Sequence, residues 1–188
     1  MTRKHALNTV FAAAILVLAM SLSAAPKPSA GAASTREVSG NESSLAEQVR
    51  HNLVMLPWYG VYDNLQFRVL NNHEVVLEGQ AFNPVTKDDA ERTIRRIEGV
   101  TRVINNIEVL PVSMFDNQIR RAEYREIYSQ PQLSRYSLGV VPQIHIIVKN
   151  GHVTLEGIVD NEADRDVAAL MASEVPSVFS VTNHLQVG

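Results

Sequence analysis

The chain has 188 residues, of which 45% are hydrophobic and 20% are charged, and its formal net charge at pH 7 is −3. This composition is that of an ordinary globular protein with room for one or two small domains. The sequence contains no cysteine, which excludes disulfides, thiolate metal sites, thiol catalysis and lipid attachment through a cysteine.

Residues 1–25 predict an export signal. Arg3 and Lys4 provide a positive start, and an almost unbroken apolar run from Val10 to Leu22 is followed by small residues. Cleavage after Ala25 or after Ala32 fits equally well, and an uncleaved anchor is the alternative, although the run is short for a membrane span. Loss of the two basic residues from a total of 17 basic and 20 acidic leaves a net charge of −5. A non-specific nucleic-acid binder is expected to be basic, so we predict no nucleic-acid partner.

Residues 26–43 are rich in Pro, Ala, Ser and Gly and predict a flexible linker. The spacing from Ser44 to Glu47 is typical of a capping box, and an apolar stripe follows at helical spacing. A first helix is therefore expected to start near Ser44 and to end before Pro57.

Alternating apolar residues predict a hairpin over 65–77 with a turn at Asn71-Asn72. Gly79 follows, where a missing Cβ permits a bulge or a close helix crossing. Asn83-Pro84 is a typical helix start, and the helix is expected to bury Ala90, Ile94 and Ile97 and to end at Gly99. Residues 103–109 alternate again and predict a third strand.

The stretch from Val75 to Gly79 occurs a second time, as Val153 to Gly157. The offset of 78 residues holds without a gap from Asn72 to Val109, and 12 of these 38 aligned pairs are identical. The second copy is expected to contain a helix over 114–128, inward residues at Ile144, Ile146 and Val148, and a tight Asn150-Gly151 turn. A helix from Asn161 with inward Ala168, Ala172 and Val175 ends at Pro176, and residues 181–187 form the last strand.

The sequence thus predicts an α+β protein made of two tandem αββαβ domains, over 44–111 and 114–188. Each is expected to be a three-stranded mixed sheet packed against two helices. A repeated fold with no nucleophile motif, phosphate-binding glycine loop or metalloprotease motif indicates a binding or structural module, so we predict no enzyme activity and no cofactor.

Three motifs resemble those of a known family. They are Val61-Tyr62-Asp63-Asn64-Leu65, the Val-x-Leu-x-Gly stretch with its twin, and the run from Gly99 to Val109 with its twin. The chain resembles the BON-domain family of exported bacterial proteins, in the two-domain arrangement of the OsmY type. The resemblance implies a non-catalytic periplasmic protein that contacts phospholipid membranes and supports the cell envelope under stress. The second copy departs from the pattern, because Val140-Val141-Pro142-Gln143 replaces the first motif and Ser177 replaces Gly99.

The helix over 115–128 carries the candidate site. If Phe115, Ile119 and Ala122 face the core, the opposite side presents four residues suited to a membrane interface: Arg121, Tyr124, Arg125 and Tyr128. The predicted partner is an anionic phospholipid surface or an envelope protein, and the sequence leaves the oligomeric state open. The alternatives are a solvated helix face, on which Glu123 and Glu126 form exposed ion pairs, or a helix face packed on the other repeat in a protein-binding or chaperone-like module. A further alternative is a cation or small ligand bound between the domains.

Three other features are expected to be structural. The apolar connection over 129–142 is expected to cover its own domain or the interface between the repeats. His145 and His184 are expected to be exposed neighbours on the outer sheet face without a third ligand, so no metal site is predicted. Asn105 and Asn183 are expected to bond the backbone.

Overall fold

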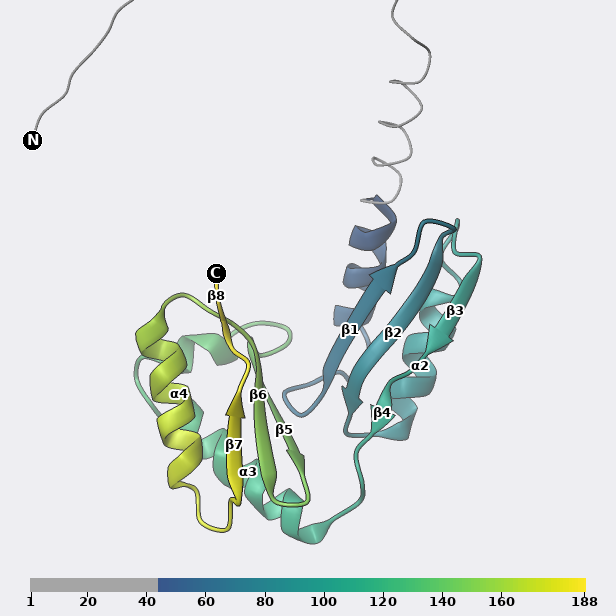
Figure 1. Cartoon of the computed structure of the whole chain (residues 1–188). Helices are drawn as coiled ribbons and strands as arrows, with labels where there is room; N and C mark the ends of the chain where they lie inside the picture. Colours follow the sequence, from purple (N-terminus) through teal and green to yellow (C-terminus); the bar gives the residue numbers. More distant parts are fainter. Residues whose placement is uncertain (1–43) are drawn as a thin grey trace, which may run out of the picture.

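The computed structural model describes residues 44–188. The predicted signal over 1–25 and the predicted linker over 26–43 lie outside the described residues. The chain folds into two α+β units, each with two helices and a small mixed sheet, and the units lie side by side (Figure 1). The predicted fold class is confirmed.

The first unit begins with a helix over 44–54, whose predicted apolar stripe is buried at Leu45, Val49 and Leu53. Strands β1 (Asn64–Val69) and β2 (Glu74–Ala81) form the predicted antiparallel hairpin. Helix α2 (Pro84–Ile94) follows, and β3 (Arg102–Asn105) and β4 (Glu108–Val109) both pair with β2 in parallel.

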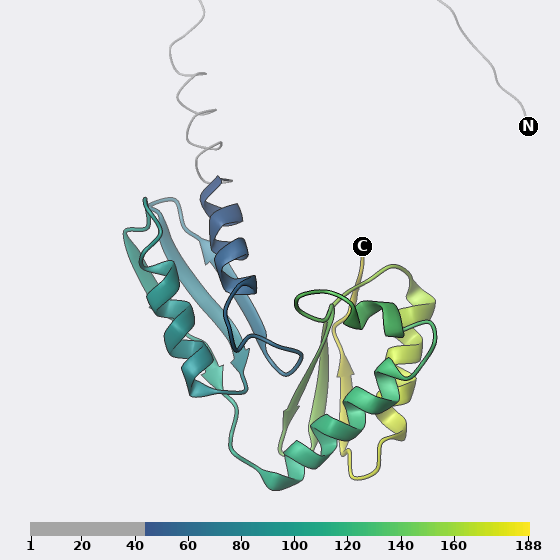
Figure 2. The same cartoon turned by 180° about the vertical axis from the view of Figure 1, so that it is seen from behind.

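The second unit repeats this order. It consists of helix α3 (Met114–Tyr128), a short 3-10 helix η1 (Ser134–Ser137), strands β5 (Ile144–Lys149) and β6 (His152–Val159), helix α4 (Glu162–Glu174), and strands β7 (Ser180–Asn183) and β8 (Gln186–Val187). Strand β6 is antiparallel to β5 and parallel to β7 and β8. In each unit the helices cover one face of the sheet (Figure 2).

The two repeated asparagines make the same bonds in both units. The side chain of Asn105 donates to the carbonyl of Lys87 and accepts from the amide of Ile107. That of Asn183 donates to Arg165 and accepts from Leu185, each 78 residues further on. These bonds tie the third strand to the preceding helix, and the local turn interrupts the strand, so the single strand expected over 103–109 is split into β3 and β4.

The repeated glycine allows two strands to approach closely. A Cβ on Gly157 would lie 1.9 Å from the carbonyl oxygen of Gln143, and one on Gly79 would lie 2.0 Å from that of Asn64. Both residues also have positive φ angles, of 125° and 99° respectively. Glycine is therefore required where the first strand of each unit pairs closely with the second.

The helix ends are mostly as predicted. The side chains of Asn83 and Asn161 cap α2 and α4, and Ala90, Ala168 and Ala172 are fully buried. The predicted end of α2 at Gly99 is wrong. The helix ends at Ile94, and the backbone continues in turns in which each amide bonds to the carbonyl three residues earlier, as from Ile97 to Ile94. Gly99 does have a positive φ, of 91°.

Helix α3 has the predicted bounds but a different buried face. Ile119 is buried as expected, but Asp116, Arg120 and Glu123 are buried as well, each one position after a residue expected to face inward, and Phe115 is 41% exposed. One position corresponds to a rotation of about 100° around the helix axis. The apolar pattern misassigned the face because three inward positions carry polar side chains.

The two units meet through the loop that precedes β1. The amide of Ile146 in β5 donates to the carbonyl of Val61 at 2.8 Å, so this loop occupies part of the free edge of the second sheet. Val61 and Tyr62 also pack against the core of the second unit. Lys149 and Glu108 form a further ion pair between the units, at 2.5 Å.

Candidate functional site

The exposed face of α3 carries two arginines without ion-pair partners. Arg121 and Arg125 are exposed, lie four residues apart, and pair with no acidic residue among residues 44–188. Tyr124, between them in sequence, is 38% exposed. Like charges at this spacing repel each other and destabilise a helix by a few tenths of a kcal/mol, so local helix stability does not explain this pair.

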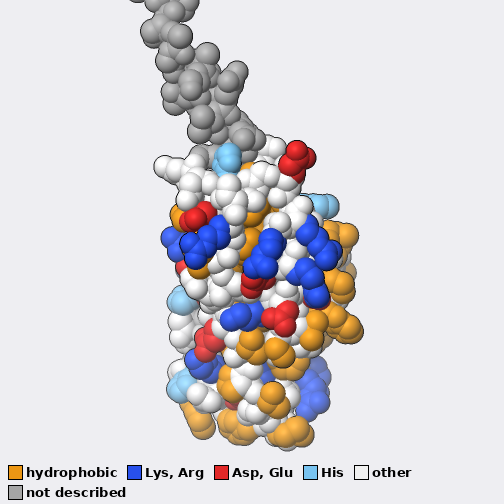
Figure 3. Space-filling model, turned by 90° about the vertical axis from the view of Figure 1, so that its right-hand side faces the viewer, with side chains coloured by type: hydrophobic (Ala, Val, Ile, Leu, Met, Phe, Trp, Pro, Cys, Tyr) orange, Lys and Arg blue, Asp and Glu red, His pale blue; other side chains and the backbone are white. Residues whose placement is uncertain are grey.

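Elsewhere the exposed arginines are mostly paired. On α2, Arg92 pairs with Asp89 and Arg95 pairs with Glu91, and basic and acidic side chains are interspersed on this side of the molecule (Figure 3). Arg96 is a further exposed arginine without an ion pair within the described part of the chain. Two adjacent unpaired guanidinium groups on one helix face are therefore a feature of α3 rather than of the surface in general.

Tyr128, the fourth residue of the predicted site, does not lie on this face. Its side chain is 8% exposed, and its hydroxyl donates to the carbonyl of Ile144 at 2.6 Å. Burial raises the pKa of Tyr128 well above its usual range. The prediction that Tyr128 is available for contact is wrong because the residue belongs to the core of the second unit.

Three buried polar residues on the inner face of the same helix were not predicted from the sequence. The carboxylate of Asp116 accepts from the amides of Asn150 and Gly151, and thereby holds the tight turn between β5 and β6. Arg120 donates to the carbonyl of Val148. Its guanidinium group also lies 5.0 Å from the centre of the Phe82 ring, which belongs to the first unit.

Glu123 is the third of these residues and is fully buried. Neither of its carboxyl oxygens has a hydrogen-bond partner among the described residues. Burial, and to a smaller extent the charge of Glu126, raises the pKa of Glu123 to about 8. Glu123 is therefore protonated at neutral pH, and the alternative in which it forms an exposed ion pair is wrong.

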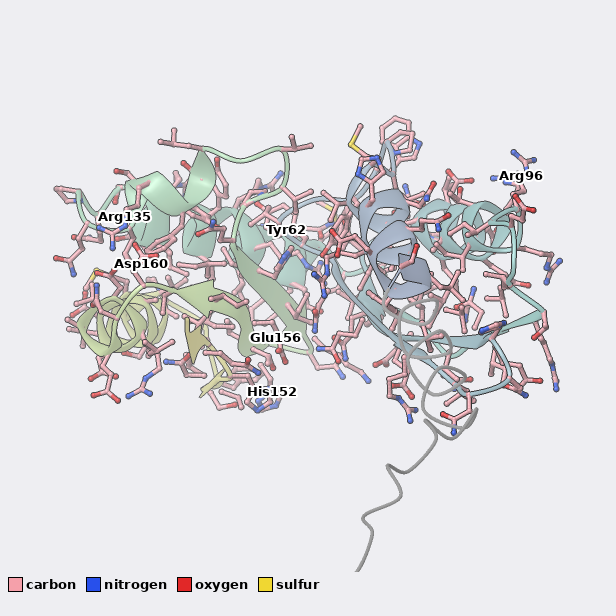
Figure 4. All side chains as sticks on the ribbon, turned by 90° about the horizontal axis from the view of Figure 1, so that it is seen from above. Tyr62, Arg96, Arg135, His152, Glu156 and Asp160 are labelled. Carbon is pink, nitrogen blue, oxygen red and sulfur yellow. The ribbon has the colours of Figure 1, made fainter. Side chains whose placement is uncertain are left out.

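The loop before β1 brings aromatic side chains of the first unit to α3. Asp63 is buried and accepts from the amides of Gly60 and Phe82, at 2.9 and 2.7 Å. These bonds fix the loop and the Phe82 backbone together. The rings of Tyr62 and Phe82 lie 6.0 Å apart, and Tyr62 lies at the junction of the two units (Figure 4).

His145 is buried rather than exposed, contrary to the prediction. Only 9% of it is exposed, because the Tyr59 ring of the first unit stacks on it with a centre-to-centre distance of 5.6 Å. Burial lowers the pKa of His145. His184 is exposed as expected and bonds to Glu156, which lies opposite His145 in the sheet, so the two histidines flank this residue rather than contact each other.

A pocket of about 650 Å³ lies beside Tyr59 and His145. Its walls come from both units and include Val54, the segment over 140–143, and Ile158. The long connection thus has two roles, since Leu133 and Tyr136 are buried in their own unit whereas Val140 is 82% exposed at this pocket.

Within residues 44–188, no three acidic or histidine side chains are grouped so that they could hold a metal ion. Over the same range, no helix has the length and apolar character needed to cross a membrane.

Comparison with protein families decides the classification. The BON domain model matches residues 41–111 and residues 133–188, which together make up more than half of the chain. The chain belongs to the BON-domain family. It contains two BON domains in tandem, as the repeat predicted. The BON-domain family is associated with phospholipid-binding envelope and stress proteins.

The other comparisons are less informative about these BON domains. No curated protein matches the sequence significantly. Two solved structures of CdsD, a structural protein of the type III secretion system of Chlamydia trachomatis, are similar to the chain. The first has 12% identity and a TM-score of 0.27, covering 76% of this chain and 91% of that one. The second, a C-terminal domain, has 13% identity and a TM-score of 0.28, covering 77% and 97%.

Proposed function

We propose that this protein is a non-enzymatic periplasmic protein that contacts anionic phospholipid through helix α3 of its second BON domain. The observation that carries the proposal is the pair of exposed, unpaired arginines, Arg121 and Arg125, with Tyr124 beside them. Guanidinium groups bind phosphate with a planar fork of donors, and tyrosine rings favour the headgroup region of a bilayer.

The rest of the molecule favours weak and local binding. After loss of the predicted signal the chain has 15 basic and 20 acidic side chains, a net charge of −5, so the net charge provides no attraction to an anionic surface and the contact depends on the arginines themselves. Such a contact weakens with salt, because the screening length falls from about 30 Å at 0.01 M to about 8 Å at 0.15 M ionic strength. We expect transient association with the membrane rather than stable anchoring.

The test is a charge-neutralising double variant with a matched control. Arg121→Gln/Arg125→Gln is expected to lose most of the binding to vesicles of phosphatidylglycerol and phosphatidylcholine, with unchanged thermal unfolding. Arg92→Gln/Arg95→Gln removes the same charge from α2 and is expected to bind like the wild type. If both variants bind equally well, the proposal fails. If the α3 variant instead loses much of its stability, a structural or protein-binding role of the helix replaces it.

A second candidate function rests on the pocket between the two BON domains. Its volume of about 650 Å³ falls in the range of small-molecule sites, and apolar residues including Val54, Val140 and Ile158 line it. This lining favours a small apolar ligand over a cation. A ligand bound only to the folded protein raises its melting temperature, so a thermal-shift screen of apolar compounds against the wild type and against an Ile158→Glu variant tests this candidate.

A further inference from the structure

The motif from Val61 to Leu65 occurs only in the first unit, and its contacts explain this asymmetry. The segment at its position in the second unit, from Val140 to Gln143, lines the pocket between the units. In the first unit, Val61 accepts from the amide of Ile146, and Tyr62 packs on the core of the second unit. The motif therefore acts on the neighbouring domain as well as on its own.

Tyr62 is linked to α3 through the side chains of Phe82 and Arg120. Its ring packs against Phe82, and Phe82 in turn stacks with the guanidinium group of Arg120. Asp63 ties the loop that carries Tyr62 to the backbone of Phe82 by accepting from the amides of Gly60 and Phe82. Through Phe82 and Arg120, Tyr62 of the first unit lies beside the same helix that carries Arg121 and Arg125.

The phenol has the properties of a hydrogen-bond donor for a bound anion. Tyr62 is half-buried, and its hydroxyl bonds to no residue in the described part of the chain. Burial raises the pKa of Tyr62, and Tyr124 raises it further, although nearby Arg120, Arg121 and Arg125 oppose the shift. The hydroxyl therefore stays protonated at neutral pH, and the arginine charges act close to it.

We propose that the phosphate site is shared between the two domains, with Tyr62 of the first donating a hydrogen bond to a lipid phosphate held by Arg121 and Arg125 of the second. This inference rests on the proposed function of α3. It makes the first domain part of the recognition surface, so phosphate binding and the packing of the two domains are coupled through one loop.

The experiment measures binding of the full mature chain to phosphatidylglycerol vesicles and compares three proteins. Tyr62→Phe keeps the ring and its packing but removes the hydroxyl, and Tyr59→Phe removes a hydroxyl from the same loop where it faces His145. A hydrogen bond to a charged group is commonly worth a roughly tenfold change in affinity. We expect Tyr62→Phe to bind about tenfold more weakly and Tyr59→Phe to bind like the wild type.

The outcomes separate the two proposals. If the wild type binds and Tyr62→Phe binds equally well, the shared site is wrong while the proposed role of the arginines stands. If the wild type does not bind, both are wrong. Competition with glycerol phosphate distinguishes the source of the phosphate: displacement from vesicles at millimolar competitor indicates a site for the free headgroup, and no displacement indicates recognition of the bilayer surface.

Discussion

Glu123 provides the sharpest test of the interior of the second domain. It is fully buried without a hydrogen-bond partner among the described residues, and its pKa is raised to about 8 from 4.5. Because the folded pKa is the higher one, the folded protein binds more protons than the unfolded chain above pH 4.5. The contribution of protonated Glu123 to the free energy of unfolding is therefore fully present below pH 4.5 and is lost as the pH rises through 8.

The magnitude follows from the shift. Each pKa unit corresponds to about 1.4 kcal/mol, so the loss amounts to roughly 3 kcal/mol at pH 7 and roughly 5 kcal/mol above pH 8. Small domains have only about 5–15 kcal/mol of stability in total. A single buried carboxyl group thus removes a large fraction of the stability of the second domain at neutral and alkaline pH.

The perturbation is Glu123→Gln, which has nearly the same shape but does not ionise. Chemical unfolding followed by circular dichroism at about pH 5 and about pH 8 gives the difference in unfolding free energy between variant and wild type. We expect a small difference at pH 5 and a variant more stable by several kcal/mol at pH 8. His145 has a lowered pKa, so its contribution is present above about pH 6.5 and is lost as the pH falls. Because it is the same in both proteins, it cancels in the difference.

A matched control is Glu174→Gln, which changes an exposed glutamate at the end of α4. This variant is expected to follow the wild type at every pH. If Glu123→Gln also follows the wild type, Glu123 is ionised in the folded protein, and the account of a protonated buried carboxyl is refuted.

Three further predictions concern the packing. Gly157→Ala places a Cβ 1.9 Å from a carbonyl oxygen, whereas the Cβ of Gly99→Ala meets nothing within 4 Å. Unfolding experiments should show a loss well above about 2 kcal/mol for the first variant and about 1 kcal/mol for the second. Equal losses would contradict the close approach of β5 and β6 at Gly157. Asp116→Ala leaves the amides of Asn150 and Gly151 without acceptors. We therefore expect a loss of about 2–4 kcal/mol in unfolding free energy and faster hydrogen exchange at these amides. Unchanged exchange would show that the carboxylate does not hold the turn. Tyr128→Phe removes one hydrogen bond to Ile144 and is expected to cost about 1 kcal/mol of stability without altering vesicle binding. Weaker vesicle binding would show that Tyr128 takes part in the lipid contact.

The fold was predictable because the same pattern occurs twice. Asn83 and Asn161 cap helices, and Gly79 and Gly157 lie at the end of the repeated strand motif, so each assignment had an independent copy that supported it. The asparagines at 105 and 183 were also predictable, because a polar residue repeated among alternating apolar ones needs a backbone partner.

The face of α3 was not predictable from apolar spacing. Its inner side carries Asp116, Arg120 and Glu123, which bond to a turn, pack on the other domain, or stay protonated. A rule that places apolar residues inside cannot find such positions. The sequence identified Arg121, Tyr124 and Arg125 as exposed and failed for Tyr128.

The contacts between the domains could not be predicted from the sequence either. His145 alternates with inward residues, so it was expected to be exposed, but the loop carrying Tyr59 covers it. Nothing in the pattern of one strand indicates that another domain packs on its outer face. The motif from Val61 to Leu65, which the second repeat lacks, was the one signal that the first unit has a role of its own.

The most direct test of the central claim is co-sedimentation of the mature chain with liposomes, comparing neutral vesicles with vesicles that contain anionic lipid, at low and moderate salt. The account predicts binding to anionic vesicles alone, weakening as salt is added, and its loss in Arg121→Gln/Arg125→Gln but not in Arg92→Gln/Arg95→Gln. Absence of binding at low salt, or binding that does not depend on Arg121 and Arg125, would contradict the account.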